Sequence, residues 1–334
     1  MAEMKKSSHS PKKYPAVIDQ IYNLFDNNVL RYFTFFIIIS FLIILPQTSS
    51  RFTQEVMSNL FFYITVCLGL NIIVGFAGLL HLGYAAFIAV GAYTTGILSA
   101  VYGINFWATL PVSILAAIIA GLAIGAPTLR LRGDYLAIVT LGFGEIVRLT
   151  VRNIGITGGA IGLIGIERPV IFGYVLNQIT HFYYMFFILA ILAIFTSYRL
   201  HNSRMGRAWE YIREDEDAAS AMGINVVSAR LYAFIIGSAF GALAGSLYSA
   251  KMTAISPESF MFLHSVMFLL AVVLGGMGKI PGVILGAAIV TIFPEISRDI
   301  GQYRLIIFAF VLLLLMLYRP QGIWPDRQYI STKK

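Results

Sequence analysis

The run Leu305-Ile-Ile-Phe-Ala-Phe-Val-Leu-Leu-Leu-Leu-Met-Leu317 contains no polar or charged side chain. A second run, from Ile37 to Leu45, is interrupted only by Ser40. Neither run alternates between polar and apolar residues, as strands of a membrane β-barrel do. A helix needs about 20 apolar residues to cross a hydrocarbon core of about 30 Å. The two runs therefore predict membrane-spanning helices.

The composition of the whole chain also indicates that lipid is its solvent. Of 334 residues, 58% are hydrophobic and 12% are charged, and the mean hydropathy is +0.79. Soluble domains usually carry about 25% charged residues. We therefore predict an all-α polytopic membrane protein.

Apolar stretches separated by short polar or Gly/Pro-containing joints predict about ten transmembrane helices. Their expected ranges are 32–46, 56–74, 84–102, 107–127, 134–151, 181–198, 229–250, 260–277, 281–297 and 303–318. No Ala-x-Ala-like cleavage site follows the first run, so we expect it to be a retained helix. The chain then consists of a basic N-terminal tail (1–31), a transmembrane domain (32–318) and a C-terminal tail (319–334).

The basic residues indicate the orientation of these helices. An even number of spans places both termini on one side, and loops rich in Lys and Arg face the cytoplasm. The two tails, the joint with Arg130 and Arg132 and the loop 199–228 carry most of these residues. We expect a multi-pass protein of the bacterial inner membrane with both termini in the cytoplasm. This topology also accounts for the net charge of +8 without a nucleic-acid partner.

Two glycine-rich segments interrupt the apolar pattern, one from Gly75 to Gly83 and one from Gly275 to Gly282. Glycine costs about 1 kcal/mol relative to alanine inside a helix, so both segments predict helix breaks. Irregular backbone at membrane depth occurs only against protein or a water-filled cavity, and transporters line their substrate path with it. Ordinary turns or close helix contacts are the alternative.

Two features are expected on the outer side. The loop from Arg152 to Ile179 contains Thr157-Gly158-Gly159, which suits a tight backbone passage or a lid facing a partner, or else a flexible loop without a role. Glu145 and Arg148 share one helix face, either as a structural pair or in the passage of a zwitterionic substrate. The residues expected along a path are Asn71, Gly75, Gly78, His81, Gly83, Tyr84, Glu145, Thr157, Gly158, Gly159, Gly275 and Gly276.

No catalytic or metal-binding motif occurs in the sequence. The five histidines do not form an HExxH or comparable spacing, and Gly278-Lys279 is followed by Ile280 rather than by the Ser or Thr of a Walker A motif. The single cysteine, Cys67, is expected to be a buried apolar side chain. We expect no metal, no cofactor and no enzymatic activity, so that energy for transport must come from a partner or an ion gradient.

The cytoplasmic segment from Ser203 to Ile224 becomes acidic at Glu214–Asp217, continues with alanines and reaches Gly223. This order predicts a short helix from about Asp215 to Met222. Such a slim helix can enter a groove on another protein, with Ala218, Ala219 and Met222 on the approaching face. A solvated connector is the alternative.

Asp217-Ala218-Ala219-x-x-x-Gly223 resembles the Glu-Ala-Ala-x-x-x-Gly signature of ABC-importer permeases, with aspartate in place of glutamate. The surrounding segment is similar to the LivM-type branched-chain amino acid permeases. Further matches include Leu129-Arg-Leu-Arg-Gly-Asp-Tyr135, Val272-Val-Leu-Gly-Gly-Met-Gly278 and Arg319-Pro-Gln-Gly322. The resemblance runs from about Gly69 to Gly322 and leaves out the N-terminal tail and first helix.

The resemblance implies a permease subunit that works with a second permease, two ABC ATPases and an extracytoplasmic substrate-binding protein. ATP would bind to the ATPase partners only. The loop 199–228 would be the coupling loop, and the residues implied in ATPase coupling are Gly206, Arg207, Arg213, Glu214, Asp215, Asp217, Ala218, Ala219, Met222 and Gly223.

The sequence departs from the family pattern in two places. The family pattern has Gln, Ser and His at the positions of Leu79, His81 and Tyr84. After Thr157-Gly158-Gly159, this chain has Ala160-Ile161 in place of the usual Pro-Asn or Pro-Asp. Urea and short-chain amide importers share this permease type and stay open as alternatives. An ion-coupled secondary transporter would need ionisable residues at the midplane and no coupling helix, and a membrane enzyme would need a clustered polar site.

The even number of spans and the basic tails predict a cytoplasmic C-terminus. A reporter enzyme fused after Lys334 should be active only when the reporter is one that works in the cytoplasm. Activity of a periplasmic reporter at the same position would contradict this topology.

Overall fold

The computed structural model describes residues 39–128, 131, 133–171, 173–296 and 322–324, together with positions 303, 309, 310, 313 and 317. It divides into two units, Met1–Ser50 and Arg51–Lys334. The described part of the first unit is an apolar helix, Ile39–Thr48. The tail 1–31, the start of the expected span 32–46 and most of the span 303–318 and of the tail 319–334 lie outside the described residues.

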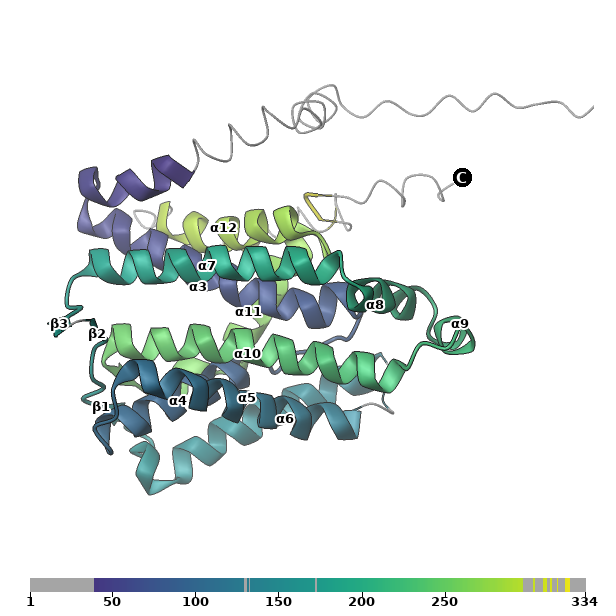
Figure 1. The fold of residues 1–334 in the computed structure, drawn as a ribbon, viewed down its shortest axis with the longest axis horizontal. Coiled ribbons are helices and arrows are strands. Elements are labelled where there is room, and N and C mark those ends of the chain that lie inside the picture. The colour runs from purple at the N-terminus through teal and green to yellow at the C-terminus, as the bar shows by residue number, and fades with distance from the viewer. Residues whose placement is uncertain are drawn as a thin grey trace, which may run out of the picture. The chain divides into compact units, whose positions relative to one another are not determined.

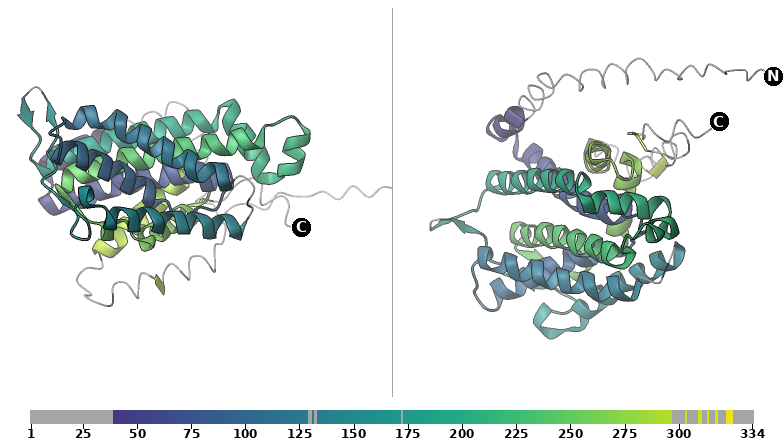
Figure 2. Two further views of the ribbon diagram at one scale, coloured as in Figure 1. Left: turned by 90° about the horizontal axis from the view of Figure 1, so that it is seen from below. Right: turned by 45° about the vertical axis from the view of Figure 1, so that its right-hand side comes forward.

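The second unit is built from helices that run alongside one another (Figures 1 and 2). The long helices are α3 (Arg51–Asn71), α4 (Ala85–Ala100), α5 (Phe106–Thr128), α6 (Asp134–Asn153), α7 (Ile179–His201), α10 (Val226–Met252), α11 (Phe262–Gly275) and α12 (Ile280–Ile296). The shorter ones are α8 (Arg204–Glu214), α9 (Glu216–Ala221), the π-helix η1 (Ile72–Phe76) and the 3₁₀ helices η2 (Gly155–Thr157) and η3 (Pro257–Phe260).

Five of the described segments are long and apolar enough to cross a membrane. They are Arg51–Phe76, Phe106–Thr128, Ile179–His201, Val226–Met252 and Pro257–Gly275, while Ala85–Ala100 and Ile280–Ile296 are shorter apolar helices. The all-α membrane class is thus confirmed, and the helix bounds lie within a few residues of the expected ones. The total of ten spans stays a prediction.

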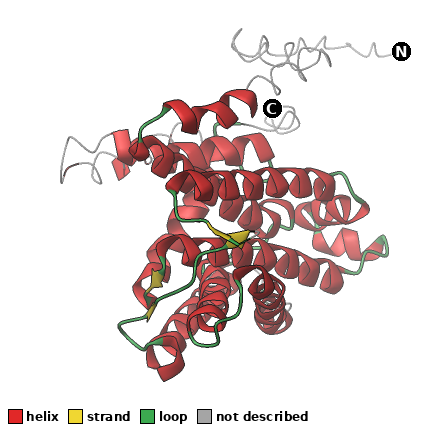
Figure 3. Ribbon diagram, turned by 60° about the vertical axis from the view of Figure 1, so that its left-hand side comes forward, coloured by secondary structure: helices red, strands yellow, loops and turns green. Residues whose placement is uncertain are grey.

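Short strands join loops at the end of the unit away from α8 and α9 (Figures 1 and 3). β1 (Leu163–Ile164) pairs antiparallel with β4 (Ala254–Ile255), and β2 (Val170–Ile171) pairs antiparallel with β3 (Tyr174–Val175). The β1–β4 pair connects the loop after α6 to the end of α10. The segment Thr157-Gly158-Gly159 lies at the start of this loop.

The centre of the unit is a close contact between α4 and α10. Gly237, Gly241 and Gly245 repeat every fourth residue along α10, so they lie on one helix face. A Cβ atom added at Gly245 would meet the carbonyl of Ile88, and one added at Gly91 would meet the backbone of Ala242. Helices in lipid associate through such small residues because these let the backbones approach.

The first glycine segment is a helix break, as expected. After α3 the chain makes the π-helical turn η1, leaves helical structure from Ala77 to Tyr84 and resumes as α4. The second segment is a tight turn between α11 and α12, with Gly276 at φ 113° and Gly278 at φ 82°. The second segment thus also breaks the helix, and its place in a substrate path stays a prediction.

Because Gly91 lies against the backbone of Ala242, Gly91→Val should push the backbones of α4 and α10 apart. Overpacking of this kind costs about 1–3 kcal/mol, so the purified variant should unfold at a clearly lower temperature than the wild type. Gly142→Val in α6 is the matched control, since nothing lies within 4 Å of a Cβ added there. Equal thermal stability of the two variants would contradict the close contact.

Candidate functional site

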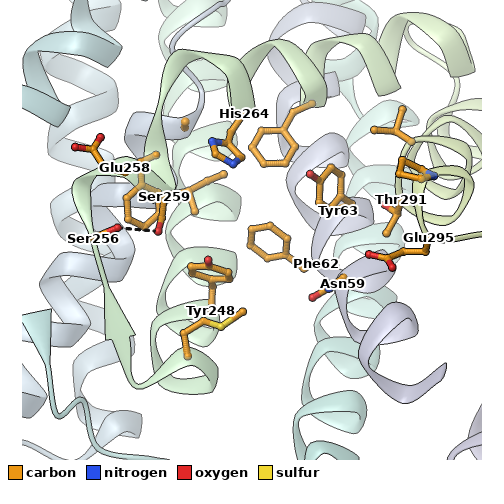
Figure 4. Close-up of a pocket in the computed structure, with 17 residues that line it drawn as sticks. Asn59, Phe62, Tyr63, Tyr248, Ser256, Glu258, Ser259, His264, Thr291 and Glu295 are labelled. Carbon is orange, nitrogen blue, oxygen red and sulfur yellow. Dashed lines mark hydrogen bonds between the residues drawn. The ribbon is translucent and has the colours of Figure 1, made fainter. Parts of the chain in front are cut away.

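A cavity of about 600 Å³ lies between α3, α4, α10, η3, α11 and α12 (Figure 4). Its lining residues are Asn59, Phe62, Tyr63, Ala85, Ile88, Tyr248, Met252, Ser256, Glu258, Ser259, Phe260, His264, Phe268, Val290, Thr291, Pro294 and Glu295. They belong to the middle of α3, the start of α4, the last turns of α10 and α12, the segment of η3 and the first half of α11. The cavity therefore lies toward the end of the helices that is away from α8 and α9.

Much of the cavity wall is aromatic. The rings of Phe62 and Tyr248 have centroids 5.4 Å apart, and those of Tyr63 and Phe268 are 5.0 Å apart. Tyr248 also contacts Phe260, with centroids 6.3 Å apart. This wall offers an apolar surface to a ligand of modest size, since cavities of about 300–1,000 Å³ hold small molecules.

The rest of the wall is polar. Glu258 and Glu295 lie on opposite sides of the cavity, as Figure 4 shows, with Asn59 and Thr291 near Glu295 and with Ser256 and Ser259 near Glu258. The hydroxyl groups of Ser256 and Ser259 are 3.4 Å apart, and the Thr291 hydroxyl donates to the Ala287 carbonyl at 2.8 Å. A bound molecule would meet carboxylates, hydroxyls and an amide at the rim of an aromatic wall.

Ion pairs connect the cavity wall to neighbouring helices. Arg148 lies 2.8 Å from Glu145, which confirms their pairing, and 3.3 Å from Glu258 across to η3. Arg152 lies 3.9 Å from the second oxygen of Glu258. Glu258 could not be identified as a partner from the sequence, because it is far from Arg148 in the chain and no local spacing connects the two residues.

A second ion pair adjoins Asn59. The ammonium of Lys251 lies 2.7 Å from Glu55 and donates to the amide oxygen of Asn59 at 3.1 Å. The Lys251 side chain is only 7% exposed, so Glu55 compensates a charge that would otherwise be costly at this depth. Because Lys251 occupies the oxygen, Asn59 can offer its NH₂ group to a ligand.

None of the expected path residues is among the described residues that line this cavity. His81 and Tyr84 are completely buried in the first break, where Tyr84 donates to the Gly237 carbonyl at 2.7 Å. Gly83 contacts the backbone of Thr140 in α6, and the Thr140 hydroxyl accepts from Leu82 N at 3.0 Å. These contacts give the break a role in helix association, and its place in a substrate path stays a prediction.

The remaining expected path residues lie at the two ends of the unit. Thr157 is buried and donates at 2.5 Å to the carbonyls of Val151 and Ile154, and Gly158 and Gly159 follow with φ of 78° and 61°. Gly275 contacts Gly282 across the α11–α12 turn, while Asn71 accepts from Gly278 N at 2.9 Å.

The expected helix from Asp215 to Met222 is confirmed as α9. Asp215 caps it by accepting from the backbone nitrogens of Asp217 and Ala218 at 3.0 and 2.9 Å. Gly223, which follows at φ 84°, adopts the left-handed conformation that favours glycine at a helix end. The described structure thus confirms both ends of the expected helix.

A second helix, α8, precedes α9, and the sequence analysis did not foresee it. The hydroxyl of Ser203 accepts from Gly206 N at 3.1 Å and caps the start of α8. Trp209 is fully buried and donates to the Ala229 carbonyl at 2.7 Å, which holds α8 against α10. The Ser203 cap is the signal that could have identified this helix.

The face assigned to α9 needs one correction. Met222 is 83% exposed and Ala218 is also exposed, but Ala219 is 3% exposed and faces its own chain. The cause is the pairing of Glu216 with Arg230 at 2.6 Å, which fixes one side of α9 against α10. The outward face therefore contains Ala218 and Met222, together with Asp217.

The other residues implied in coupling belong to α8. Gly206 is buried against the carbonyls of Leu200 and His201, and Arg207 donates to the Asn202 carbonyl at 3.3 Å. Glu214 is exposed at the end of the helix. Arg213 donates to the Gly75 carbonyl at 2.6 Å. Within the described ranges, no three His, Cys, Asp or Glu side chains group as a metal site.

Comparisons with known proteins agree on one family. A family model described as "Branched-chain amino acid transport system / permease component" matches residues 52–318. The high-affinity branched-chain amino acid transport system permease protein LivM of Escherichia coli (strain K12) is 41% identical over 304 residues, covering 84% of this chain and 72% of the relative. No solved structure gives a significant match.

Two more distant relatives extend the comparison. The probable branched-chain amino acid transport permease protein LivM of Methanocaldococcus jannaschii is 30% identical over 321 residues, covering 80% of this chain and 92% of the relative. The permease protein LivH of the E. coli system is 35% identical over 140 residues, covering 41% of this chain and 44% of the relative.

The burial of Ala219 predicts different effects for two neighbouring substitutions. Ala219→Arg must bury a charge or displace α9 from α10, at a cost of several kcal/mol, so the purified protein should unfold at a lower temperature. Ala218→Arg adds the same side chain to the outward face and should leave the unfolding temperature near that of the wild type. Similar stability of both variants would contradict the inward orientation of Ala219.

Proposed function

The chain belongs to the family of branched-chain amino acid transport permeases, and from this premise we propose that it is the membrane-spanning permease subunit of an ABC importer for branched-chain amino acids. It provides part of the path across the bilayer and performs no chemistry itself. The observation that carries the proposal is the cavity with one aromatic and one polar side, whose chemistry fits this substrate class.

A branched-chain amino acid has an aliphatic side chain, an ammonium group and a carboxylate. The aromatic wall around Phe62 and Phe268 suits the side chain, because apolar burial contributes about 25 cal/mol per Å². The ammonium group pairs with Glu295 or Glu258. The amide NH₂ of Asn59, which lies near Glu295 in Figure 4, is the donor that suits the carboxylate. The Thr291 hydroxyl donates its proton to the Ala287 carbonyl, so its oxygen can accept from the ammonium group.

The partners follow from the other end of the molecule. The exposed residues Ala218 and Met222 form the surface on which an ATPase docks, and the two ATPases bind the ATP. A second permease completes the path, since the E. coli system to which this chain is similar has two proteins named as permeases, LivM and LivH. A binding protein delivers the substrate on the outer side, and both termini lie in the cytoplasm.

Two alternatives, a urea-type substrate and an ion-coupled mechanism, fit these features less well. Urea and short amides lack an aliphatic branch and would leave the aromatic wall without a partner. An ion-coupled transporter working alone has no use for an exposed helix such as α9. The branched-chain amino acid importer accounts for both the cavity and the helix.

The proposal predicts that filling the cavity blocks uptake. Ser259→Trp places a large ring among the lining residues, and uptake of radiolabelled leucine should fall by about tenfold or more in cells that express all subunits and lack other leucine importers. Leu115→Trp is the control, because Leu115 lies on the outward face of α5 and is 58% exposed.

The same cells can distinguish the substrates. Excess isoleucine or valine should compete with leucine, and excess urea should not. Normal leucine uptake by Ser259→Trp would show that the cavity is not part of the substrate path. Absence of leucine uptake in the wild type would overturn the proposed substrate class.

A further inference from the structure

Arg213 connects α8 to the first glycine segment. It lies in the last turn of α8, and its Nη1 donates to the Gly75 carbonyl at 2.6 Å. Gly75 lies in the π-helix η1 at the end of α3. The last carbonyls of a helix have no partner within the helix and carry partial negative charge, so a guanidinium is a strong donor to them.

Arg213 also fills the space beside two further glycines. A Cβ atom added at Gly78 would lie 2.7 Å from the Cγ of Arg213, and one added at Gly278 would lie 2.7 Å from its Nη1. Both glycines have positive φ, 70° and 82°. The side chain therefore fits between the first break and the α11–α12 turn, where only glycine leaves room for it.

The two glycine segments contact each other at the same place. Asn71, the last residue of α3, accepts from Gly278 N at 2.9 Å, and a Cβ atom added at Gly75 would meet both the Asn71 amide and Gly278 N. One guanidinium and one amide thus hold together α8, the end of α3 and the turn between α11 and α12. We call these residues, Arg213, Gly75, Gly78, Asn71 and Gly278, the Arg213 junction.

The helices that meet at the Arg213 junction also line the cavity, α11 and α12 near their other ends and α3 at its middle. α3 contributes Phe62 and Tyr63, α11 contributes His264 and Phe268, and α12 contributes Thr291 and Glu295. A rigid helix that is displaced or tilted at one end carries that movement to the other. The adjoining glycines and the π-helical turn, a feature frequent at functional sites, are positions where backbone angles can change.

We propose that Arg213 is the positioning residue that transmits movement of the α8–α9 segment to the helices lining the cavity. This inference rests on the proposed function, in which an ATPase docks on α9. The Glu216–Arg230 and Trp209–Ala229 contacts fix the same segment to α10. A docked partner that displaces α8 and α9 therefore acts on α3, α11 and α12 through the Arg213 junction, and on α10 through these two contacts.

The first test is Arg213→Gln in the complete transporter reconstituted in liposomes, with leucine and the binding protein. Leucine-stimulated ATP hydrolysis and leucine uptake should fall about tenfold, the size expected when a hydrogen bond to a charged group is lost. The ATPase subunits should still co-purify with the variant, because the outward face of α9 is unchanged. The matched control, Arg204→Gln at the start of α8, should behave as the wild type.

A disulfide provides a second test that does not depend on how well Arg213→Gln folds. A Cβ atom at position 78 would lie 3.3 Å from the Cβ of residue 213, near the separation in disulfides. Gly78→Cys combined with Arg213→Cys should recover leucine-stimulated hydrolysis when oxidised and lose it with dithiothreitol. Cys67, the single native cysteine, is buried and should not take part.

The outcomes separate the two ideas. Wild-type coupling by Arg213→Gln, or wild-type coupling by the double-cysteine variant in both redox states, would overturn the role of Arg213 while leaving the importer intact. A wild-type complex that shows no leucine-stimulated hydrolysis would instead overturn the proposed function.

Discussion

The hydrocarbon of a bilayer offers no hydrogen-bond partner, so each backbone group that leaves a helix must find one within the protein. The break after η1 meets this constraint with side chains from other helices. The Thr140 hydroxyl accepts from Leu82 N, and the Ser265 hydroxyl accepts from Ala85 N at 2.9 Å. Arg213 and Asn71 do the same for the Gly75 carbonyl and Gly278 N. The break is therefore also the place where α6, α8 and α11 are held against α3 and α4.

Polar side chains and glycines have complementary roles in this arrangement. Glycines at 91, 241 and 245 allow α4 and α10 to touch along their backbones, which gives contact without side-chain entropy cost. Ion pairs such as Lys251–Glu55 and Arg148–Glu258 occur instead beside the cavity. The close apolar contact and the polar wall thus occupy different parts of the same unit, and α10 takes part in both.

Much of the fold was predictable because its signals are local. The lengths of the apolar stretches predicted the described helix bounds to within a few residues, and glycine and proline predicted the breaks. The spacing of three residues predicted the Glu145–Arg148 pair. The six-residue helix α9 was predictable from its cap and terminal glycine, but it is too short for a periodic pattern to show which face is buried, and Ala219 was placed wrongly. The cavity was not predictable, because residues of six elements form it. Contacts such as Arg148–Glu258 have no signature in sequence spacing.

The β1–β4 pair has a consequence for biosynthesis. Leu163 pairs with Ile255, so the loop after α6 cannot complete its contacts until α7 to α10 have been made and inserted. At about 5–20 residues per second, this interval lasts several seconds. During this time the loop lacks its strand partner and α4 lacks its neighbour α10. The early helices therefore cannot complete their packing until the later helices have been synthesised and inserted. Assembly of this subunit thus depends on synthesis of its later half.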